Sequence, residues 1–419
     1  MTERVKQLLG HLSNRASAVD RLSTKNPDDV VVTMAFRTPL CKARKGGFKA
    51  MGSDELLLAT FKAARARMGL LDPAVIQDIT VGTVLTPEAP YAARAAALTA
   101  GFPETAAVQV INRFCSSGLM AISTVANAIR NQEIDCGLAV GYENMSANPD
   151  KGTQGFSEEI MACPAAADCK MPMGWTSENV AKEFNITREA MDLYAARSHT
   201  RAERARATGL FKEEIEPIEA WTRPADPDSS SPRTKVTVSE DDGIRTNTTP
   251  AGLAKIRSAF PQWPPAQTTG GNASQITDGG AAVLLMTRRK AEELGLVVLA
   301  KHVATSVTGL APRIMGIGPA LAIPRLMERT GLGIGEVDLF EINEAFASMY
   351  VYCIEKLGLD PEKVNVNGGA IALGHPLGCT GTRQVATGIA EARRRGSKTL
   401  VTSMCIGLGM GAAALWIVE

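Results

Sequence analysis

Short apolar runs alternate with longer segments of helical spacing along most of the chain. From Val30 onward the apolar runs have the length of buried strands and end at polar or glycine-rich turns. Before residue 145 the strand-like runs are 30–34, 79–81, 108–111 and 137–141, and the helical segments between them are 56–68, 91–100 and 117–130. This βαβα alternation predicts parallel strands covered by helices on both faces, which is the α/β class.

The pattern changes between residues 145 and 273, where proline, serine and charged residues become more frequent. One helix is expected over 188–208, with Thr187 as its N-cap and Gly209 beyond its end. A loop is expected over 224–232. We interpret the whole segment as an inserted lobe. The arginines of its helix predict a solvated face, with attraction of an anionic ligand as the alternative: Arg197, Arg201, Arg204 and Arg206.

Alternation resumes after the lobe, and a weak internal repeat appears. The further strand-like runs are 281–286, 296–300, 337–342, 364–366, 400–403 and 412–418. The first copy consists of the run 108–111, a turn with Cys115, a helix and a strand. The second copy consists of the run 364–366, a glycine-rich turn with His375, a helix and a strand. Both copies put reactive residues at the carboxyl end of a strand, where open α/β sheets place ligand sites.

The first residues have an amphipathic helical pattern and lack the long apolar core of a secretory signal. Their apolar positions follow helical spacing, and Arg4 and His11 lie on one side of the expected helix. The segment 4–12 resembles the N-terminal type 2 peroxisomal targeting signal, with a frayed amphipathic end as the alternative. The polar, small residues 13–28 predict a linker.

Composition excludes several classes of function. Lys plus Arg is 45 and Asp plus Glu is 44, so the net charge of +1 argues against a nucleic-acid binder. A length of 419 residues predicts two or three domains. No apolar window reaches the roughly 18 residues of a membrane span. The eight cysteines form no Cys-x-x-Cys pair, which predicts neither a structural zinc site nor a disulfide framework.

Two candidate reactive residues stand where a strand is followed by a helix. Cys115 lies in Asn-Arg-Phe-Cys-Ser-Ser-Gly, where the helix N-terminus stabilises a thiolate. A buried cysteine that packs under the helix is the alternative. His375 lies in the glycine-rich segment 368–378, which places it by backbone geometry, and a turn histidine with satisfied hydrogen bonds is the alternative. This segment lacks Gly-Lys-Ser/Thr and is no phosphate-binding P-loop.

Two further candidates also stand at strand ends. Cys405 begins Cys-Ile-Gly-Leu-Gly-Met-Gly, whose backbone N–H groups can line an oxyanion pocket, or else form a plain turn beside an inert cysteine. Asn343 begins Asn-Glu-Ala-Phe and can orient a water or a ligand carbonyl, or simply cap a helix. Two cysteines, a histidine and an asparagine at strand ends suit acyl transfer through a thioester.

Together these blocks resemble the thiolase family from about residue 28 to the end of the chain. Gly-His-Pro, Cys-x-Gly-x-Gly and Asn-Glu-Ala-Phe in this arrangement are specific to it. The resemblance implies that Cys115 is the nucleophile that carries the acyl group, His375 its activating base, and Cys405 the acid/base at the α-carbon of acetyl-CoA. It also implies that Asn343 holds a water in one oxyanion hole, and that the N–H groups of Cys115 and Gly407 form a second.

The resemblance also implies contacts to coenzyme A (CoA). Ser274, in Gly-Asn-Ala-Ser, matches the serine that meets the pantetheine, and Arg245 matches the arginine beside the adenine. Met315 and Phe346 match apolar walls near the pantetheine and the acyl end. Gly252 stands where the family often has a serine.

The branch of the family follows from one substitution and from the chain start. Pro172 replaces the histidine of the His-Met-Gly that is usual in biosynthetic acetoacetyl-CoA thiolases, which resembles the degradative 3-ketoacyl-CoA branch. The resemblance thus implies cleavage of 3-ketoacyl-CoA by CoA to acetyl-CoA and a shortened acyl-CoA, in peroxisomal fatty-acid β-oxidation. The alternatives are an acetoacetyl-CoA thiolase, a β-ketoacyl synthase, which Cys405 disfavours, and an acyl-CoA binder without turnover.

The family also sets expectations for partners and fold. It implies a homodimer, with a tetramer as the alternative, no metal, no permanently bound cofactor, CoA as a substrate, and an import receptor that binds residues 4–12. It implies the thiolase fold, in which duplicated βαβαβαββ halves form a five-layer α/β/α/β/α body with an inserted loop domain. The expected boundaries are a targeting segment and linker over 1–27, an N-terminal half over 28–144 plus 274–295, a CoA-binding loop domain over 145–273, and a C-terminal half over 296–419.

Overall fold

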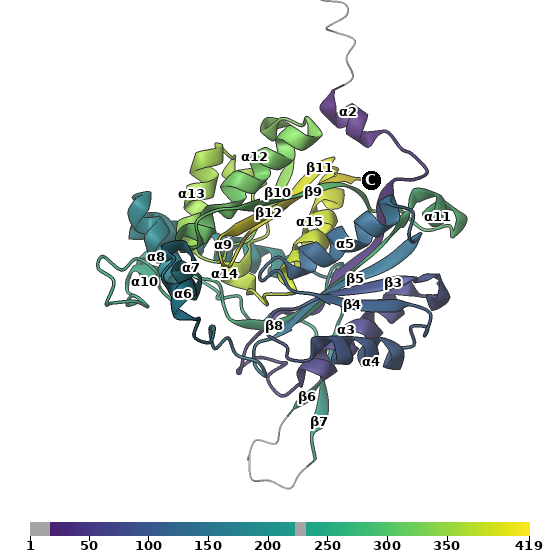
Figure 1. Ribbon diagram of the computed structural model, residues 1–419, viewed down its shortest axis with the longest axis horizontal. Coiled ribbons are helices and arrows are strands. Elements are labelled where there is room, and N and C mark those ends of the chain that lie inside the picture. Colours follow the sequence, from purple (N-terminus) through teal and green to yellow (C-terminus); the bar gives the residue numbers. More distant parts are fainter. Residues whose placement is uncertain (1–16, 223–231) are drawn as a thin grey trace, which may run out of the picture.

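The fold is organised around one long mixed sheet, seen in the computed structural model (Figure 1). The structure describes residues 17–222 and 232–419, so the proposed targeting segment 4–12 and most of the predicted loop 224–232 lie outside the described residues. The strand order is β10-β11-β12-β9-β1-β8-β5-β3-β4, with the short β2 (Cys41–Lys42) beside β8.

In the N-terminal half of the sheet, the strands that pair in parallel are three neighbours at its outer end. β3 (Asp78–Gly82) pairs in parallel with β4 (Ala107–Ile111) and β5 (Cys136–Asn144). β1 (Val30–Arg37), β3, β4 and β5 all run in one direction, so the parallel order predicted for these four strands is confirmed. β8 (Thr277–Thr287), which follows the lobe, runs antiparallel to its two neighbours β5 and β1. The register gives the reason. Asn144 at the end of β5 pairs with Asp278 near the start of β8. The chain therefore leaves the sheet for the lobe and re-enters it at the same end of the strands.

The second half repeats this order. β10 (Leu339–Ile342) and β11 (Thr399–Ile406) are parallel, and β12 (Met410–Val418) is antiparallel to β11 and to β9 (Ala300–Gly309). A single parallel bridge between Val364 and Phe340 stands in the place of β4, so the predicted strand 364–366 shrinks to that contact. The predicted strand 296–300 was also misplaced, because β9 begins where that run ends. The predicted repeat is confirmed.

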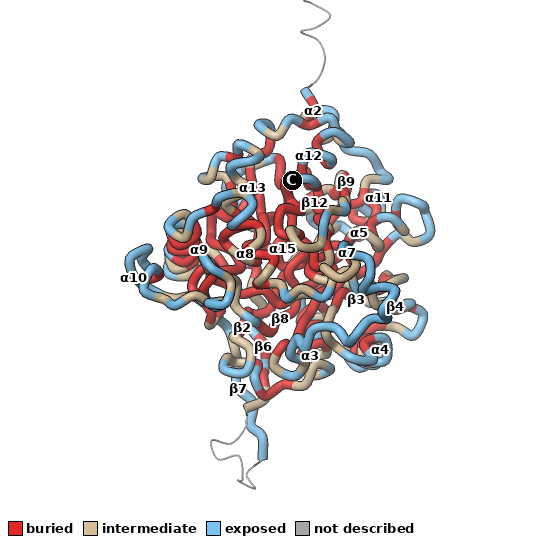
Figure 2. Tube along the Cα trace, turned by 60° about the vertical axis from the view of Figure 1, so that its left-hand side comes forward, coloured by how far each residue is buried: buried red, intermediate tan, exposed pale blue. Residues whose placement is uncertain are grey.

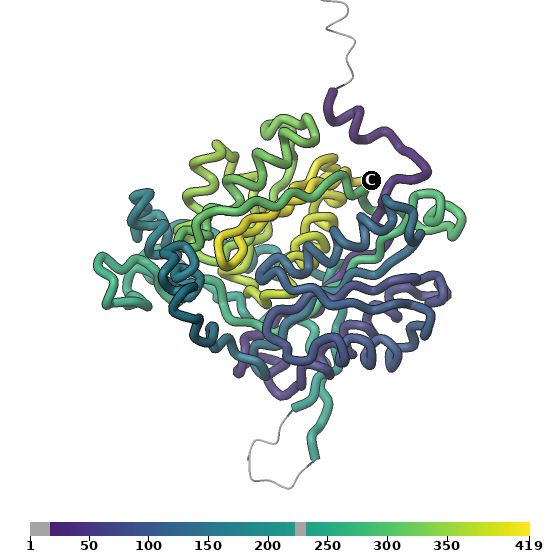
Figure 3. Tube along the Cα trace, viewed as in Figure 1, coloured from purple at the N-terminus to yellow at the C-terminus, as the bar shows by residue number. Residues whose placement is uncertain are grey.

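Helices complete five layers, which Figures 1 and 3 show in the same view. α5 (Ser117–Arg130) and α15 (Thr380–Arg395) pack against each other between the two halves of the sheet. α3 (Ser53–Met68) and α4 (Ala89–Thr99) cover the outer face of the first half, and α12 (Gly318–Thr330) and α13 (Ala347–Leu357) that of the second. The halves also join at one edge, where Val31 and Val32 of β1 pair with Lys301 and Ala300.

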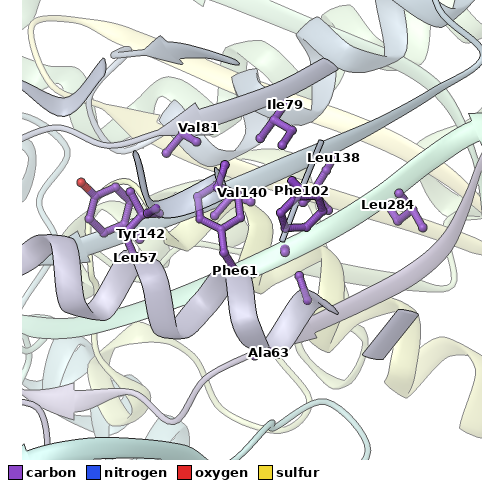
Figure 4. Packing of buried hydrophobic residues seen from close by; sticks show 14 of the residues in the cluster. Leu57, Phe61, Ala63, Ile79, Val81, Phe102, Leu138, Val140, Tyr142 and Leu284 are labelled. Atoms are coloured by element: carbon purple, nitrogen blue, oxygen red, sulfur yellow. The ribbon is translucent and has the colours of Figure 1, made fainter. Parts of the chain in front are cut away.

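The buried residues gather at the centre of the molecule, as Figure 2 shows, and they form clusters on both faces of the sheet. Figure 4 shows one cluster, in which side chains of α3 pack on β3, β5 and β8. Phe61 is completely buried and meets Phe102 edge-on, with ring centroids 5.6 Å apart. Full burial of such a side chain contributes about 1.5–3 kcal/mol. Every residue of β5 and of β8 is buried, which explains their continuous apolar sequences.

The lobe packs on both halves of the body, with one of its helices on α13 and its hairpin on α3. Its elements are α6 (Glu158–Met161), α7 (Pro164–Ala167), α8 (Met173–Glu183), α9 (Arg188–Ala207), α10 (Pro250–Ala254) and the hairpin of β6 (Ile218–Thr222) with β7 (Thr234–Val238). The prediction for α9 is confirmed at its start, because the Thr187 hydroxyl accepts a hydrogen bond from the Ala190 N–H.

The solvated face predicted for the arginines of α9 was wrong for Arg201, whereas Arg204 is exposed and Arg197 and Arg206 are half-buried. Arg201 is buried and donates to the carbonyl of Val364 at 2.7 Å, and Arg204 donates to the carbonyl of Val366 at 2.8 Å. The chain at 364–366 does not form a regular strand, so these carbonyls lack ladder partners, and the guanidinium groups satisfy them.

The remaining elements are short. α2 (Ala18–Ser23) lies within the predicted linker, closed by a capping box between Ser17 and Asp20, and Ala18 packs on the second half. The others are α11 (Arg288–Glu293), α14 (Ala370–Leu373) and the 3₁₀ turns η1 (Pro73–Val75), η2 (Asp168–Lys170), η3 (Pro312–Ile317), η4 (Ile334–Glu336) and η5 (Pro361–Lys363). In the described ranges no helix is both long and apolar enough to cross a membrane. The domain boundaries given above stay a prediction.

Candidate active site

Cys115 lies in a tight turn between β4 and α5. The preceding residue, Phe114, has a positive φ of 46°, which makes the chain turn sharply. The hydroxyl of Ser117 accepts from the N–H of Arg113 at 2.9 Å and donates to the carbonyl of Phe114 at 2.7 Å. The small residues that follow Cys115 therefore stabilise the turn by hydrogen bonds, and they also leave space beside the cysteine. The cysteine itself is 8% exposed.

The thiol of Cys115 is protonated at rest. Burial raises its pKa to about 11, while the backbone N–H groups of Gly407 and of Cys115 itself lower the pKa by hydrogen bonding to the sulfur. Burial outweighs these donors, so the helix N-terminus does not by itself produce the thiolate that the sequence suggested. A base close to the sulfur is needed to take its proton.

Gly407 contributes its backbone here. It follows Cys405 at the end of β11, where Leu408 and Gly409 with positive φ lead into β12. A Cβ on Gly407 would meet only ordinary contacts, the nearest at 3.6 Å, so steric fit does not explain the glycine. The structure therefore brings together the two N–H groups that the resemblance assigns to one oxyanion hole.

The backbone of His375 is fixed from the first half of the chain. His375 follows α14 and Gly374, whose φ of 108° suits only glycine. Its N–H donates to the carbonyl of Gln275 at 3.0 Å and to the hydroxyl of Thr277 at 3.2 Å. The segment between lobe and β8 thus sets the position of a residue one hundred positions later.

The imidazole of His375 is held at both nitrogens. Nδ1 lies 2.6 Å from Oγ1 of Thr380, and Nε2 lies 3.3 Å from Nδ2 of Asn343. Burial lowers the pKa of His375 to about 3, and the positive charge of Arg383 lowers it further. The ring is neutral at physiological pH, which is the state of a proton acceptor.

Asn343 follows the last residue of β10, and its N–H donates to the carbonyl of Ser403. Its Oδ1 is buried and has no hydrogen-bond partner among the described residues. Such an orphaned oxygen costs about 1–3 kcal/mol, and it marks a place for a small polar partner such as a water. The helix-capping alternative does not apply, because the N-cap of α13 is Phe346.

Cys405 lies in β11 opposite Gly411, and its side chain enters an apolar cluster with Met315, Met349 and Ala345. Its Sγ is 3.4 Å from Sδ of Met349. Burial raises the pKa of Cys405 well above its usual value, and the neighbouring Cys115 raises it further. The two thiols are therefore close enough to influence each other, and neither ionises readily.

The structure brings three of the four CoA candidates to the same place. The N–H of Ser274 donates to the carbonyl of Ala345 at 3.0 Å, and Ala273 pairs with Phe346. Phe346 and Met315 belong to the apolar cluster of Cys405. The fourth candidate, Arg245, lies on the lobe, where its guanidinium donates to the carbonyl of Gly270 at 3.1 Å.

Sequence reasoning missed several residues that hold the site. Glu344 accepts hydrogen bonds from four donors, which joins α9 of the lobe to the segment before His375: Tyr194, Ser198, Asn365 and Ile371. It stands inside the Asn-Glu-Ala-Phe block, so its place in the motif was the available signal. Thr380 and Met349 carry no such signal, because only the fold sets them beside His375 and Cys405.

Within the described ranges, no group of three or more His, Cys, Asp or Glu residues could hold a metal ion. The chemistry that the site offers is that of a thiol with nearby N–H donors, a neutral imidazole and a second thiol. These groups can exchange an acyl group between two thiols and move a proton at a carbon atom.

Comparison with known families assigns the chain. Residues 30–289 match the family model described as thiolase, N-terminal domain, and residues 296–418 match thiolase, C-terminal domain. The chain belongs to the thiolase family. It has the thiolase fold, a mixed α/β sheet with helices, as expected.

Similar thiolases are known from several organisms. One is 3-ketoacyl-CoA thiolase 5, peroxisomal, of Arabidopsis thaliana, which is 48% identical over 97% of this chain and 90% of its own length. The dimeric peroxisomal thiolase of Saccharomyces cerevisiae has a crystal structure that matches with a TM-score of 0.87 and 44% identity, over 95% of this chain and 100% of that one. Human mitochondrial 3-ketoacyl-CoA thiolase in complex with CoA matches with a TM-score of 0.81 and 36% identity, over 93% and 98%.

Proposed function

We propose that this thiolase cleaves 3-ketoacyl-CoA with CoA, giving acetyl-CoA and a shortened acyl-CoA, as an acetyl-CoA C-acyltransferase of fatty-acid β-oxidation. The observation that carries the proposal is the convergence on one site of the ends of β4, β10 and β11 with the turn that holds His375. It puts the Cys115 thiol beside the N–H of Gly407, and couples it electrostatically to Cys405. The curated names of relatives at this identity support the same activity.

In the first half-reaction Cys115 attacks the 3-keto carbon of the substrate. His375 takes the thiol proton on Nε2, because its neutral ring is an acceptor. The developing oxyanion needs N–H donors that are already in place, and the backbone of Gly407 and Cys115 supplies them. When the bond between the α and β carbons breaks, Cys405 gives its proton to the departing α-carbon of acetyl-CoA.

In the second half-reaction CoA removes the acyl group from Cys115. The thiol of CoA gives its proton to the Cys405 thiolate that the first half-reaction left, and Cys115 leaves as a thiol by taking back the proton held on His375. Asn343 holds a water through its unpartnered Oδ1, and this water donates to a thioester oxygen. An acyl-enzyme that forms and decays in two steps predicts ping-pong kinetics.

CoA is a substrate in this scheme and no cofactor stays bound. A related thiolase forms a complex with CoA, which supports CoA as the ligand. Ser274, Met315 and Phe346 would line the pantetheine path toward Cys405, because they lie around its apolar cluster. Arg245 on the lobe would meet the charged, nucleotide end of CoA.

The assembly is a homodimer formed along β4. This strand is at one end of the sheet, carries no charged residue, and exposes Ala107 and Gln109 with its valines half-buried. Beside it, Tyr91 of α4 is 81% exposed. An uncharged, unpaired edge strand is a pairing site unless it is covered. The related yeast thiolase is named as dimeric, which supports this assignment.

The protein acts in peroxisomes. The names of its relatives support this location, and the segment 4–12 is proposed as the signal that an import receptor binds. Fusion of residues 1–16 to a fluorescent protein tests the signal. Import of the fusion, and loss of import after replacement of Arg4 and His11 by alanine, is the expected result.

A chain-length series of thiolysis tests the activity. Cleavage should extend from the four-carbon substrate to substrates of sixteen carbons, and Cys115→Ala should abolish it. Activity on the four-carbon substrate alone would make the protein an acetoacetyl-CoA thiolase. Binding of acyl-CoA without an acyl-enzyme at Cys115 would make it a binder without turnover.

A further inference from the structure

The side chain of Thr380 is buried against the ring of His375. Thr380 is the first residue of α15 and is completely buried, and its Oγ1 lies 2.6 Å from Nδ1 of the histidine. The same Oγ1 lies 3.1 Å from the carbonyl of Pro376, one turn earlier, and donates to it. A hydroxyl has one proton, so while it donates to that carbonyl it acts toward Nδ1 as an acceptor.

The contact at the other ring nitrogen, Nε2, also indicates that the proton of the neutral ring is on Nδ1. Asn343 places its Nδ2, a donor only, 3.3 Å from Nε2. Nε2 must then offer a lone pair. A neutral ring has one proton, which is left on Nδ1, where Thr380 accepts it. Donor and acceptor are matched at all three contacts only in this tautomer.

We propose that Thr380 is a positioning residue, which holds His375 in the tautomer with Nδ1 protonated so that Nε2 is the atom that receives the Cys115 proton. The proposal rests on the proposed function. In the transfer, the bond between the proton and Sγ of Cys115 breaks and a bond from that proton to Nε2 forms in place of the 3.3 Å contact with Nδ2 of Asn343, which leaves a thiolate and an imidazolium. The Nδ1–H···Oγ1 hydrogen bond stays in place throughout.

The surroundings explain why an acceptor at Nδ1 matters. The ring is buried, Arg383 lies one turn further along α15, and the N-terminus of that helix is itself positive. All three disfavour an imidazolium. The oxygen of Thr380 is a fixed dipole with its negative end toward Nδ1, so it stabilises the charged ring at the moment of transfer.

The test compares three variants at Thr380 with one control. Thr380→Val keeps the shape and removes the acceptor, Thr380→Ala removes it without overpacking, and Thr380→Ser keeps a hydroxyl. Thr382→Val is the control, since this hydroxyl is equally buried in the same helix but donates to the carbonyl of Cys379. The readouts are kcat and KM for thiolysis, and the rate at which iodoacetamide alkylates Cys115 at neutral pH.

We expect Thr380→Val and Thr380→Ala to lower kcat by about 10- to 100-fold, as loss of a hydrogen bond that orients an imidazole does, with KM changed less than about twofold. Alkylation of Cys115 should slow in parallel. Thr380→Ser and the Thr382→Val control should stay within about threefold of the unchanged protein in both readouts.

Three outcomes overturn the proposal. They are full activity of Thr380→Ala, a loss in Thr380→Ser as large as in Thr380→Ala, and a loss in the Thr382→Val control as large as in Thr380→Val. If Thr380→Val does not fold, the comparison of Thr380→Ala with Thr380→Ser decides in the same way. An unchanged protein without thiolysis would instead refute the proposed function, so the two failures are distinguishable.

Discussion

Nδ2 of Asn343 lies 3.3 Å from Nε2 of His375, although the two residues come from different loops of the second half. The amide orients the imidazole, and its oxygen is left buried without a described partner. One side chain thus contacts the base with Nδ2 and can hold a water, which donates to Oδ1, with its other atom.

Replacement of Asn343 should therefore impair turnover more than binding. Asn343→Ala removes both the donor to His375 and the support of the oxyanion, so kcat should fall by about 10²- to 10³-fold. KM should change far less, because the CoA candidates do not involve this side chain. Steady-state kinetics check this, and a fall confined to KM would contradict the role given to Asn343.

The pH dependence of alkylation follows from the two shifted groups. The pKa of Cys115 is raised to about 11 and that of His375 is lowered to about 3, so both are neutral between these values. The reactive thiolate is then a minor species whose population grows with pH. The rate of alkylation of free enzyme by iodoacetamide should rise through pH 9 and 10 without a plateau near 7. A plateau near neutral pH would show a stable thiolate–imidazolium pair.

The same groups predict the pH limits of stability. The folded pKa of His375 is depressed from 6.5, so its contribution to the free energy of unfolding is lost as pH falls below 6.5 toward 3. The folded pKa of Cys115 is raised from 9.0, so its contribution is lost as pH rises above 9 toward 11. Urea unfolding at several pH values measures this. Relative to the unchanged protein, His375→Asn should lose less stability in acid and Cys115→Ala less in alkali.

Cys405 should be needed for chemistry at carbon and not for acyl transfer between thiols. Cys405→Ala keeps Cys115 and its N–H donors, so incubation with acyl-CoA should still acylate Cys115. Exchange of the α-protons of acetyl-CoA with solvent should fall to background. Mass spectrometry of the acyl-enzyme and NMR of the exchange measure the two steps. Equal loss of both would assign Cys405 a structural part only.

Gly118 should be required by the approach of the two central helices. A Cβ at this position would lie 2.6 Å from the carbonyl oxygen of Gly378 and 2.9 Å from the N–H of Thr382. Gly118→Ala therefore forces α5 away from the segment after His375, at a cost of about 1–3 kcal/mol and with reduced kcat. Gly335→Ala is the matched control, because no atom lies within 4 Å of its Cβ. Equal melting temperatures for the two variants would refute this.

Replacement of Arg201 should lower the stability of the protein, because its guanidinium is a buried hydrogen-bond donor. It donates to the carbonyls of Val364 and Pro361. Arg201→Met leaves those carbonyls unpaired and should destabilise the protein by about 1–3 kcal/mol. Arg206→Met, on the same helix and only partly buried, should change stability by less than about 0.5 kcal/mol. Denaturant unfolding compares the two, and a harmless Arg201→Met would restore the solvated-face interpretation.

Local patterns were sufficient for most of the elements. The helix α9, with its Thr187 cap, and the buried strand β5 follow from spacing and caps, because these depend on neighbours within a turn or on one face. The direction of β8 could not be read in the same way. Because a long insertion precedes β8, the sequence does not indicate at which end of the strands the chain re-enters the sheet. A run of apolar residues has the same pattern for either strand direction.

The sequence by itself determined the family and the candidate reactive residues, because motifs such as Gly-His-Pro require specific backbone and side-chain chemistry at fixed spacing. Only the tertiary structure decided the protonation states of these residues. Burial raises the pKa of Cys115 and lowers that of His375, and burial is a property of the packed layers. The contact of Thr380 with His375 was likewise settled by packing, since a hydroxyl at the start of a helix has many possible partners until the helix is buried.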